Sequence, residues 1–311
     1  MSIYIAVDLG GTHIRAASFF PESTEPIKHN KIKTRSKDET IFERILGLIE
    51  SVIPANEILE AIGIAAPGPL DPRKGVILNT PNIPAWKNFP LVEKLNAHFS
   101  VPVYLGNDAN LAVLGEWKYG AGRGHDYLLY LTISTGVGGG IISDGHLLEG
   151  VEGLGAELGH VTVLADGPEC GCGHRGHLEA FSSGTAIAKY VEDQLKDKST
   201  ESSLRSSAKR TAKSIAKAAQ KGDPLAISAY ERAGKYLGIG VASFLHIFNP
   251  SIVIFGGGVS QSGDLLFDPF RESLKKAIFA PAYLKNLTIT TAELGDNAGL
   301  LGALALVKKK I

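Results

Sequence analysis

The pattern that most restricts the fold is a strand, a glycine-containing turn and a second strand, which occurs twice. Residues 3–9 (IYIAVDL) and 14–20 (IRAASFF) are apolar runs of strand length on either side of Gly10, Gly11, Thr12 and His13. A related pattern returns at residues 127–143, as YLLYLTIS, TGVGGG and IIS. Two hairpins so far apart in the chain indicate two similarly built halves rather than a short-period solenoid. Because the two copies share few identities, a chance similarity of unrelated hairpins stays open.

Strand and helix patterns alternate along the rest of the chain, which favours an α/β architecture. A length of 311 residues is enough for two domains. The helices predicted from apolar periodicity cover residues 41–53, 109–120, 235–248 and 296–307. Further strands are predicted at 58–66, 101–108 and 251–255, and an ordered loop at Asn79–Pro90.

The overall charge gives no reason to expect nucleic acid or an anionic membrane as a partner. Lysine plus arginine and aspartate plus glutamate number 32 each, so an anionic ligand has to be held by a local site. No apolar run reaches the length of a membrane helix, and no signal peptide is evident. The two cysteines, Cys170 and Cys172, are too close in sequence for an unstrained disulfide. A cytoplasmic protein is expected.

Three glycine segments have the composition of a nucleotide site. They are Gly10, Gly11 and Thr12, then Thr135 and Gly136, and the run that begins with Gly256 and Gly257 after SIVIF. Glycine lets backbone N–H groups approach phosphate oxygens closely. Asp8, at the end of the first strand, is suited to orient Mg²⁺ through water. Taken singly, each turn is more often a plain tight hairpin, and only the three together favour a nucleotide site.

Two common nucleotide motifs do not account for the chain. No G-x-x-x-x-G-K-[ST] segment occurs, so a P-loop is excluded. A G-x-G-x-x-G match at Gly171, Gly173 and Gly176 contains Cys172 and His174, and we do not interpret it as a dinucleotide fingerprint.

Asp108 is the candidate general base. The segment Leu105-Gly106-Asn107-Asp108 ends a predicted strand and begins a helix, at the strand edge where α/β proteins bind ligands. Phosphoryl transfer to a hydroxyl needs positioning, charge neutralisation and a carboxylate that accepts the proton. The local pattern allows equally that Asp108 is a helix N-cap.

Side chains suited to a polyol occur at Asn82, Asn107, Glu157, His160 and Glu179. Carboxylates, amides and imidazoles each bind one or two hydroxyl groups. Surface charge, a structural histidine and turn asparagines are the alternative interpretations of these residues.

Two histidines and two cysteines form a candidate structural zinc site. His160, Cys170, Cys172 and His177 provide the ligands that Zn²⁺ accepts in a closed tetrahedron. Such a site would hold the loop that carries His160 and Glu179. His174 is a possible substitute ligand, and unliganded cysteines with surface histidines are the alternative.

The segments VDLGGTHIRAA, AAPGPLD, NTPNIPAW, LGNDANLAVLGEW, ISTGVGGGII, AELGHVTV and CGCGHRGHLE together resemble the ROK family, particularly its glucokinases. The resemblance extends over essentially the whole chain in the same order. It implies the actin-like ATPase fold, a duplicated ribonuclease-H-like α/β fold with two domains and a cleft between them for ATP and sugar. The domains expected are 1–115 plus 297–311 and 116–296.

The resemblance also implies site roles. It places phosphate contacts on Gly10, Gly11, Thr12, Thr135 and Gly136, adenosine contacts on Gly256 and Gly257, and the base on Asp108. Sugar contacts fall on Gly68, Asn82, Asn107, Glu157, His160 and Glu179. The activity implied is phosphorylation of a hexose by ATP, most simply of glucose at its 6-hydroxyl, in a homodimer.

The chain departs from the family pattern at one position. The zinc segment of the family usually reads Cys-x-Cys-Gly-x-x-Gly-Cys, and His177 occupies the last position here. A His₂Cys₂ site with altered affinity is expected. Repressors of the family carry a helix-turn-helix domain before the kinase-like part, and the chain as given starts directly on the first phosphate strand, which favours a kinase. The choice of hexose, ATP or polyphosphate as donor, and a sugar-sensing protein without turnover stay open.

Overall fold

The first hairpin forms the centre of a five-stranded sheet. In the computed structural model, which describes residues 1–80, 83 and 85–311, β1 (Ser2–Leu9) pairs antiparallel with β2 (His13–Phe19). β2 pairs antiparallel with β3 (Lys28–Lys33). On its other side β1 runs parallel to β4 (Ile58–Ala66), and β4 runs parallel to β8 (Val103–Asn107). The sheet order is β3-β2-β1-β4-β8.

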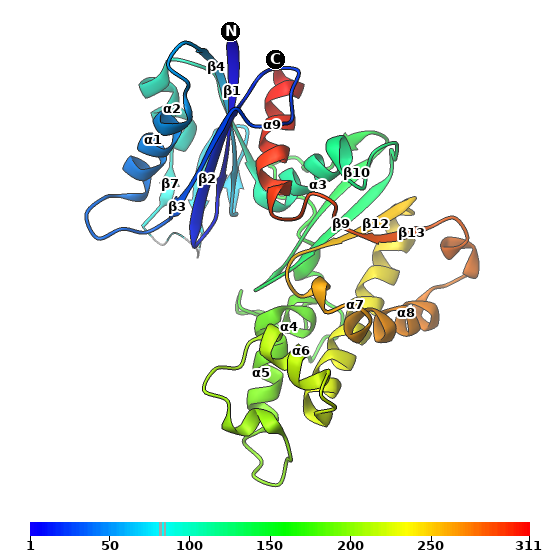
Figure 1. The fold of residues 1–311 in the computed structure, drawn as a ribbon. Coiled ribbons are helices and arrows are strands. Elements are labelled where there is room, and N and C mark those ends of the chain that lie inside the picture. The colour runs from blue at the N-terminus through cyan, green and yellow to red at the C-terminus, as the bar shows by residue number, and fades with distance from the viewer. Residues whose placement is uncertain (81–82, 84) are drawn as a thin grey trace. The chain divides into compact units, whose positions relative to one another are not determined.

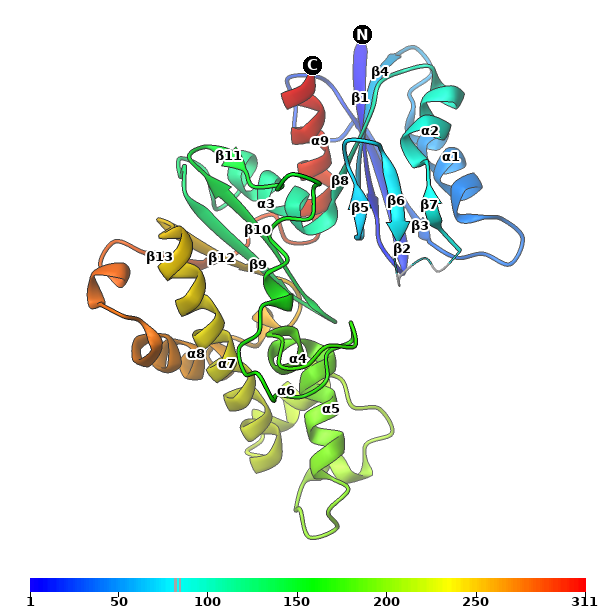
Figure 2. The ribbon, with the colours of Figure 1, turned by 180° about the vertical axis from the view of Figure 1, so that it is seen from behind.

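Alternation along β1 gives this sheet two buried faces. Ile3, Ile5 and Val7 belong to one apolar cluster, with residues of α1 (Ile41–Val52) and α2 (Leu91–Phe99). Tyr4 and Ala6 belong to a second cluster, with residues of α3 (Asp108–Tyr119) and α9 (Ala298–Lys310). Figures 1 and 2 show α1 and α2 covering one face of the sheet and α9 covering the other.

Helices α3 and α9 approach each other unusually closely. A Cβ atom at Gly302 would lie 1.7 Å from the carbonyl oxygen of Leu111, so only glycine fits there. The buried carboxylate of Glu116, on α3, accepts hydrogen bonds from the backbone N–H groups of Glu293 and Leu294. These bonds attach the segment that precedes α9 to helix α3.

The second sheet repeats the strand order of the first. It runs β11-β10-β9-β12-β13, with β12 parallel to both β9 and β13 and β10 antiparallel to β11. The repeat predicted from two similar hairpins is therefore confirmed as a repeat of topology. The strands are β9 (Leu128–Ile133), β10 (Val137–Ser143), β11 (His146–Leu147), β12 (Ile252–Gly256) and β13 (Thr288–Thr291).

Helices of the second half pack around α7 (Pro224–Phe248), which contacts α8 (Asp264–Ala277), α4 (Glu179–Ser182), α5 (Gly184–Gln194) and α6 (Ala212–Ala219). Short 3₁₀ turns occupy Leu158–His160, Ser203–Ser206, Ser260–Ser262, Pro281–Leu284 and Gly295–Asn297. Among the described residues, none of the helices has the length and apolar character needed to span a bilayer.

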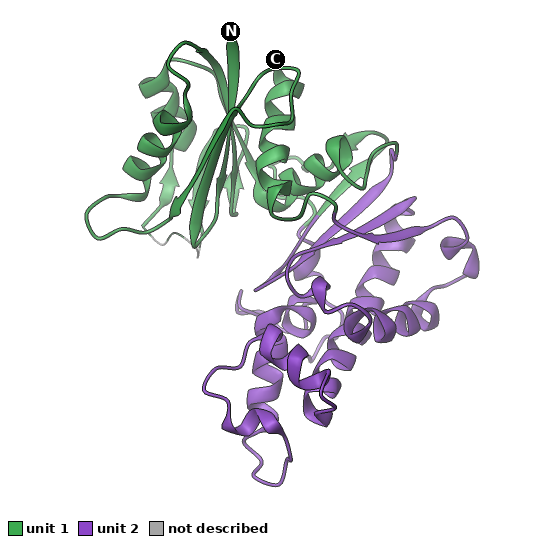
Figure 3. Cartoon of the chain, viewed as in Figure 1, with its two compact units in different colours: residues 1–124, 140–156, 293–311 green, residues 125–139, 157–292 purple. Residues whose placement is uncertain are grey.

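The chain divides into two units (Figure 3). Unit 1 comprises residues 1–124, 140–156 and 293–311, and unit 2 comprises 125–139 and 157–292. The division passes within β10. The domain boundaries expected from sequence, 1–115 plus 297–311 and 116–296, stay a prediction.

Two local expectations differ from the structure. The glycine run after Thr135 was expected to be a turn, yet β10 begins at Val137 and includes Gly138, Gly139 and Gly140. The reason is close packing, since a Cβ at Gly139 would meet the side chain of Leu158 at 2.5 Å. The expected loop at Asn79–Pro90 contains a strand, and a small sheet joins β5 (Leu70–Asp71), β6 (Val76–Asn79) and β7 (Lys87–Phe89).

Candidate functional site

The parallel strands of unit 1 bring three predicted site residues to one sheet edge. Asp8 pairs in register with Ala65 of β4, and Ala66 pairs with Asn107 of β8. Gly68 follows β4 directly, and a Cβ there would lie 3.0 Å from the Asn107 amide nitrogen. Asp8, Gly68 and Asn107 therefore lie along the carboxyl ends of neighbouring strands, which is where α/β sheets bind ligands.

Asn107, and not Asp108, caps helix α3. The Asn107 side-chain oxygen accepts hydrogen bonds from the backbone N–H groups of Ala109 and Asn110, at 3.0 and 3.2 Å. The alternative that Asp108 serves as the N-cap is therefore wrong. Asp108 is the first helical residue, half-buried, and its Oδ1 accepts from the N–H of Ala109 at 2.8 Å. A carboxylate in the first turn is stabilised by the positive end of the helix dipole.

Asp8 is deeply buried and paired with a residue that the sequence did not single out. Its Oδ2 accepts a hydrogen bond from the Arg15 guanidinium at 2.5 Å, across the β1–β2 hairpin. Burial raises the pKa of the Asp8 carboxyl above its ordinary value, and Arg15 opposes that shift. A Cβ at Gly299 would lie 3.1 Å from Oδ1, so the N-terminal turn of α9 borders the same carboxylate.

The first glycine turn, at residues 10–12, is held by hydrogen bonds from Thr34, a residue outside the glycine motif. Its own bond joins the Gly10 N–H to the His13 carbonyl, at 2.9 Å. Thr34, fully buried after β3, donates its hydroxyl to the Gly10 carbonyl at 2.6 Å and its N–H to the Thr12 carbonyl at 2.9 Å. Gly11 and Thr12 are exposed. Thr34 was missed because a lone threonine after a polar strand has no distinguishing local pattern.

The second turn, in unit 2, is held by the start of α5. The Ser134 N–H bonds the Gly136 carbonyl at 2.9 Å. The Gly184 N–H donates to the Ser134 carbonyl at 2.7 Å, and the Thr185 hydroxyl donates to the Thr135 carbonyl at 2.7 Å. Thr185 was also not foreseen, although the Ser-Gly-Thr sequence that precedes an apolar run is a typical helix start.

The third glycine segment lies beside the second. Gly257 has φ of +85°, and a Cβ on it would meet the Ile133 carbonyl oxygen at 2.3 Å. The N–H of Val259 bonds that same carbonyl at 2.9 Å. Ile133 ends β9 immediately before the Ser134–Gly136 turn, so unit 2 brings Thr135, Gly136, Gly256 and Gly257 together.

Glu179 joins the second turn to the cysteine segment. Its Oε2 accepts the Val137 N–H at 2.9 Å, and its Oε1 accepts the thiol of Cys170 at 3.4 Å. A Cβ at Gly136 would lie 2.4 Å from Oε2, so this carboxylate packs directly against the turn. The carboxylate was predicted to bind sugar, and the structure places it against the turn predicted to bind phosphate.

His160 and Glu157 are carried by a 3₁₀ turn packed against β10. A Cβ at Gly159 would lie 1.9 Å from the Val137 carbonyl oxygen, so this turn touches β10 backbone to backbone. Glu157 is exposed, and its carbonyl accepts the N–H of His160 at 3.0 Å. His160 and Glu179 are thereby brought close to one another through Cys170.

The four predicted metal ligands form one cluster. The ligand atoms of His160, Cys170, Cys172 and His177 all lie within 4.8 Å of one another. The His160 Nδ1 is 3.7 Å from the Cys170 sulfur, and the His177 Nδ1 is 3.3 Å from the Cys172 sulfur. Zinc bonds of ~2.0 Å to nitrogen and ~2.3 Å to sulfur give tetrahedral edges of about 3.3–3.8 Å, so the donor set fits Zn²⁺.

Burial favours the neutral forms of two cluster residues, Cys170 and His177. Burial raises the pKa of the Cys170 thiol to about 12, with Cys172 and Glu179 as further influences. Burial lowers the pKa of His177, and the positive charges that His160 and His174 can carry add to this. His174 itself is outside the cluster, and its carbonyl accepts the Cys170 N–H at 2.7 Å. The glycines of the G-x-G-x-x-G match shape this turn, since Gly173 and Gly176 have positive φ.

One predicted sugar contact, Asn82, lies outside the residues that the structure describes. The remaining ones divide between the units. Gly68, Asn107 and Asp108 belong to unit 1, and Glu157, His160 and Glu179 belong to unit 2.

Comparisons with known proteins agree with this geometry. The family model described as "ROK family" matches residues 4–310. A glucokinase of Thermotoga maritima is 38% identical over 99% of this chain and 98% of its own length. A ROK family glucokinase from Streptomyces griseus, solved with glucose and AMPPNP, superimposes with a TM-score of 0.81 at 35% identity, covering 98% of each chain. A xylose repressor of Caldicellulosiruptor bescii is 33% identical over 97% of this chain and 77% of the repressor.

Proposed function

This chain belongs to the ROK family and has its actin-like ATPase fold, and from that premise we propose that it is an ATP-dependent glucokinase that forms glucose 6-phosphate and ADP. The observation that carries the proposal is the 38% identity to a glucokinase over nearly the full length of both chains. The local geometry supports it, because Asp108 opens α3 at the carboxyl edge of the parallel strands while Asn107 makes the capping bonds.

Asp108 is proposed as the general base. The sugar hydroxyl oxygen attacks the γ-phosphorus, its proton passes to the Asp108 carboxylate, and the bond from the γ-phosphorus to the bridging oxygen of ADP breaks. A helix N-terminal position suits this role, since the helix dipole stabilises negative charge there and the side chain is carried by a rigid element.

The phosphate chain is assigned to the glycine segments. Gly10, Gly11, Thr12, Thr135 and Gly136 are the proposed phosphate contacts, and Gly256 and Gly257 the proposed adenosine contacts. Mg²⁺ supplies charge neutralisation on the phosphates when bound, and Asp8 would hold it through water. The Arg15 pair and the border with α9 fix the orientation of that carboxylate.

The hexose is assigned to polar and backbone groups. The proposed contacts are Gly68, Asn82, Asn107, Glu157, His160 and Glu179. His160 can serve as both a metal ligand and a sugar contact, because its Nδ1 faces Cys170 and its Nε2 remains for a hydroxyl. The tautomer follows from the metal bond.

A structural Zn²⁺ held by His160, Cys170, Cys172 and His177 is proposed to fix the loop that carries the sugar contacts. Four protein ligands leave no open coordination position, so zinc takes no part in the reaction. A cytoplasmic homodimer, and no nucleic-acid partner, complete the proposal. The alternatives are the same chemistry on fructose, mannose or an N-acetylhexosamine, and sugar sensing without turnover.

The test is a coupled ADP-release assay on a panel of these sugars, run with wild type and with Asp108→Asn. We expect glucose to give the highest kcat/KM, and the variant to lose at least about 100-fold in kcat while glucose still binds in calorimetry. Asp38→Asn, at an exposed bend of unit 1, is the matched control and should keep wild-type turnover.

Near-normal turnover in Asp108→Asn would exclude that residue as the base. A higher kcat/KM for another sugar would replace glucose with that sugar. Sugar binding without any ADP release in the wild type would identify a sensor.

A further inference from the structure

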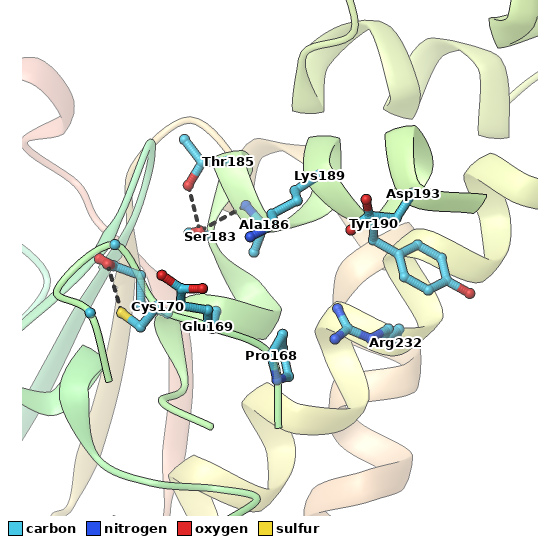
Figure 4. A pocket seen from close by; sticks show the side chains of 14 residues that line it. Pro168, Glu169, Cys170, Ser183, Thr185, Ala186, Lys189, Tyr190, Asp193 and Arg232 are labelled. Atoms are coloured by element: carbon cyan, nitrogen blue, oxygen red, sulfur yellow. Dashed lines mark hydrogen bonds between the residues drawn. The ribbon is translucent and has the colours of Figure 1, made fainter. Parts of the chain in front are cut away.

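A cavity in unit 2 borders the proposed metal ligand Cys170 and the proposed sugar contact Glu179, but most of its lining residues have no role assigned above. Its volume is about 390 Å³, which is large enough for a small metabolite. It is lined by the loop at residues 168–173, the start of α4, one face of α5 and Arg232 of α7 (Figure 4). The glycine segments that face the proposed nucleotide do not line it.

Arg232 is the charged group that sets the chemistry of this cavity. Its guanidinium lies 4.6 Å from the ring of Phe181 and 5.0 Å from the ring of Tyr190. Tyr236, which stacks on Phe181 with ring centroids 3.8 Å apart, lies on a further side. Three aromatic rings therefore fix the position of one cation.

That cation has no anionic partner. Within the described part of the chain, no carboxylate, carbonyl or hydroxyl accepts a hydrogen bond from Arg232. Burial lowers the pKa of Arg232, and the neighbours that oppose this are the two tyrosines, not a carboxylate. A half-buried guanidinium with five unused donors is costly unless an anion binds to it.

The other lining groups support an anion at this end of the cavity. Lys189, on the face of α5 that lines the cavity, provides a second positive charge. Two of the three lining carboxylates are already engaged, Asp193 with Lys196 at 2.6 Å and Glu179 with Val137. Figure 4 shows the third, Glu169, toward Cys170, while Arg232 lies beside Tyr190 at the other end.

We propose that this cavity binds a small phosphate-bearing anion, through the fork of Arg232 and the charge of Lys189. A guanidinium matches two phosphate oxygens at once, and a dianion satisfies both cations. The occupant would also affect Glu179, because Phe181, against which Arg232 packs, lies in the same short helix α4. The anion would take no part in the proposed transfer reaction, although the proposed sugar contact Glu179 also lines the cavity.

The test is calorimetric titration of the zinc-replete full chain with two probes, inorganic phosphate and glycerol 3-phosphate. We expect saturable binding of at least one probe. Arg232→Gln should weaken it at least about tenfold, since a charge-assisted bidentate contact is lost. Arg271→Gln is the matched control, because Arg271 lies on the neighbouring helix α8 and is paired with Asp264 and Asp268.

A preference for one probe identifies the source, free phosphate or an organic phosphate monoester. Lys189→Gln, at an exposed position, should weaken binding of the preferred probe severalfold. This variant tests the proposal if Arg232→Gln fails to fold. Absence of saturation for both probes, or equal affinity in wild type and the Arg232 and Lys189 variants, would overturn the proposal.

Discussion

Single side chains far from the glycine motifs hold those motifs in shape. Thr34 bonds two carbonyls of the first turn, and Thr185 bonds a carbonyl of the second. In both turns a hydroxyl binds a backbone carbonyl and so fixes the direction in which that carbonyl points. The N–H groups of the same turn then point away from the hydroxyl. In the proposed nucleotide site, such residues would act on the phosphate without touching it.

Thr34→Val should raise the KM for ATP about two- to tenfold, because one buried hydrogen bond to the Gly10 carbonyl is lost. The valine keeps the shape and the backbone bond to Thr12, so the KM for glucose should change little. Ser18→Ala is the control, since the buried Ser18 hydroxyl has no hydrogen-bond partner among the described residues. An unchanged KM for ATP in Thr34→Val would show that the turn is held by its backbone alone.

Among the elements, the long helix α7 begins at an N-cap residue, Asp223, whose carboxylate also accepts hydrogen bonds from a second segment. The buried carboxylate of Asp223 accepts the N–H of Ala226 at 3.0 Å and the N–H and hydroxyl of Ser203, each at 2.7 Å. Burial favours the neutral acid, yet bonds from Ser203, Ala226 and Ser202 outweigh it and hold the pKa of Asp223 below its usual value. One side chain therefore joins the start of α7 to the Ser203–Ser206 turn.

Asp223→Asn should lower the free energy of unfolding by about 1–3 kcal/mol at pH 7. Because the folded pKa of Asp223 is depressed, its contribution is present above the unfolded value of ~3.9 and is lost as the pH falls through the folded value. The difference between variant and wild type should thus shrink below about pH 4 in denaturant titrations. Asp264→Asn, at the exposed start of α8, should show little change at either pH.

At the scale of the whole molecule, two sheets of the same strand order are completed by segments distant in sequence. Residues 293–311 belong with unit 1, although residues 157–292 of unit 2 precede them in the chain. Residues 140–156 also belong with unit 1, although residues 125–139 of unit 2 precede them. The cysteine and histidine cluster, in contrast, lies wholly within unit 2. Loss of a metal there is expected to act on one unit first.

Purified protein should contain about one equivalent of zinc by elemental analysis. Removing it with a chelator should lower the melting temperature of the first unfolding transition by at least ~5 °C, since a structural zinc site contributes directly to folding. Cys172→Ser should behave like stripped protein, and His146→Gln, at an exposed histidine outside the cluster, like wild type. If the protein contains less than a tenth of an equivalent of zinc and is fully active, the cluster does not hold a structural zinc ion.

The sequence by itself determined the elements whose signals are local. The two hairpins, the strand that ends at Asn107 and the helix that follows it agree with the structure because apolar alternation and helix periodicity are properties of neighbouring residues. The four predicted metal ligands lie in one segment of the chain, residues 160–177, and the structure gathers them into one cluster.

The tertiary structure decided which side chains meet. Thr34 reaches Gly10 across 24 residues, and Glu179 reaches Val137 across 42, so no window of sequence contains either pair. The same holds for Arg232 and two of its aromatic neighbours, Phe181 of α4 and Tyr190 of α5. Burial, close packing and the demand that buried polar groups find partners act between segments, and those forces become specific only when the chain is folded.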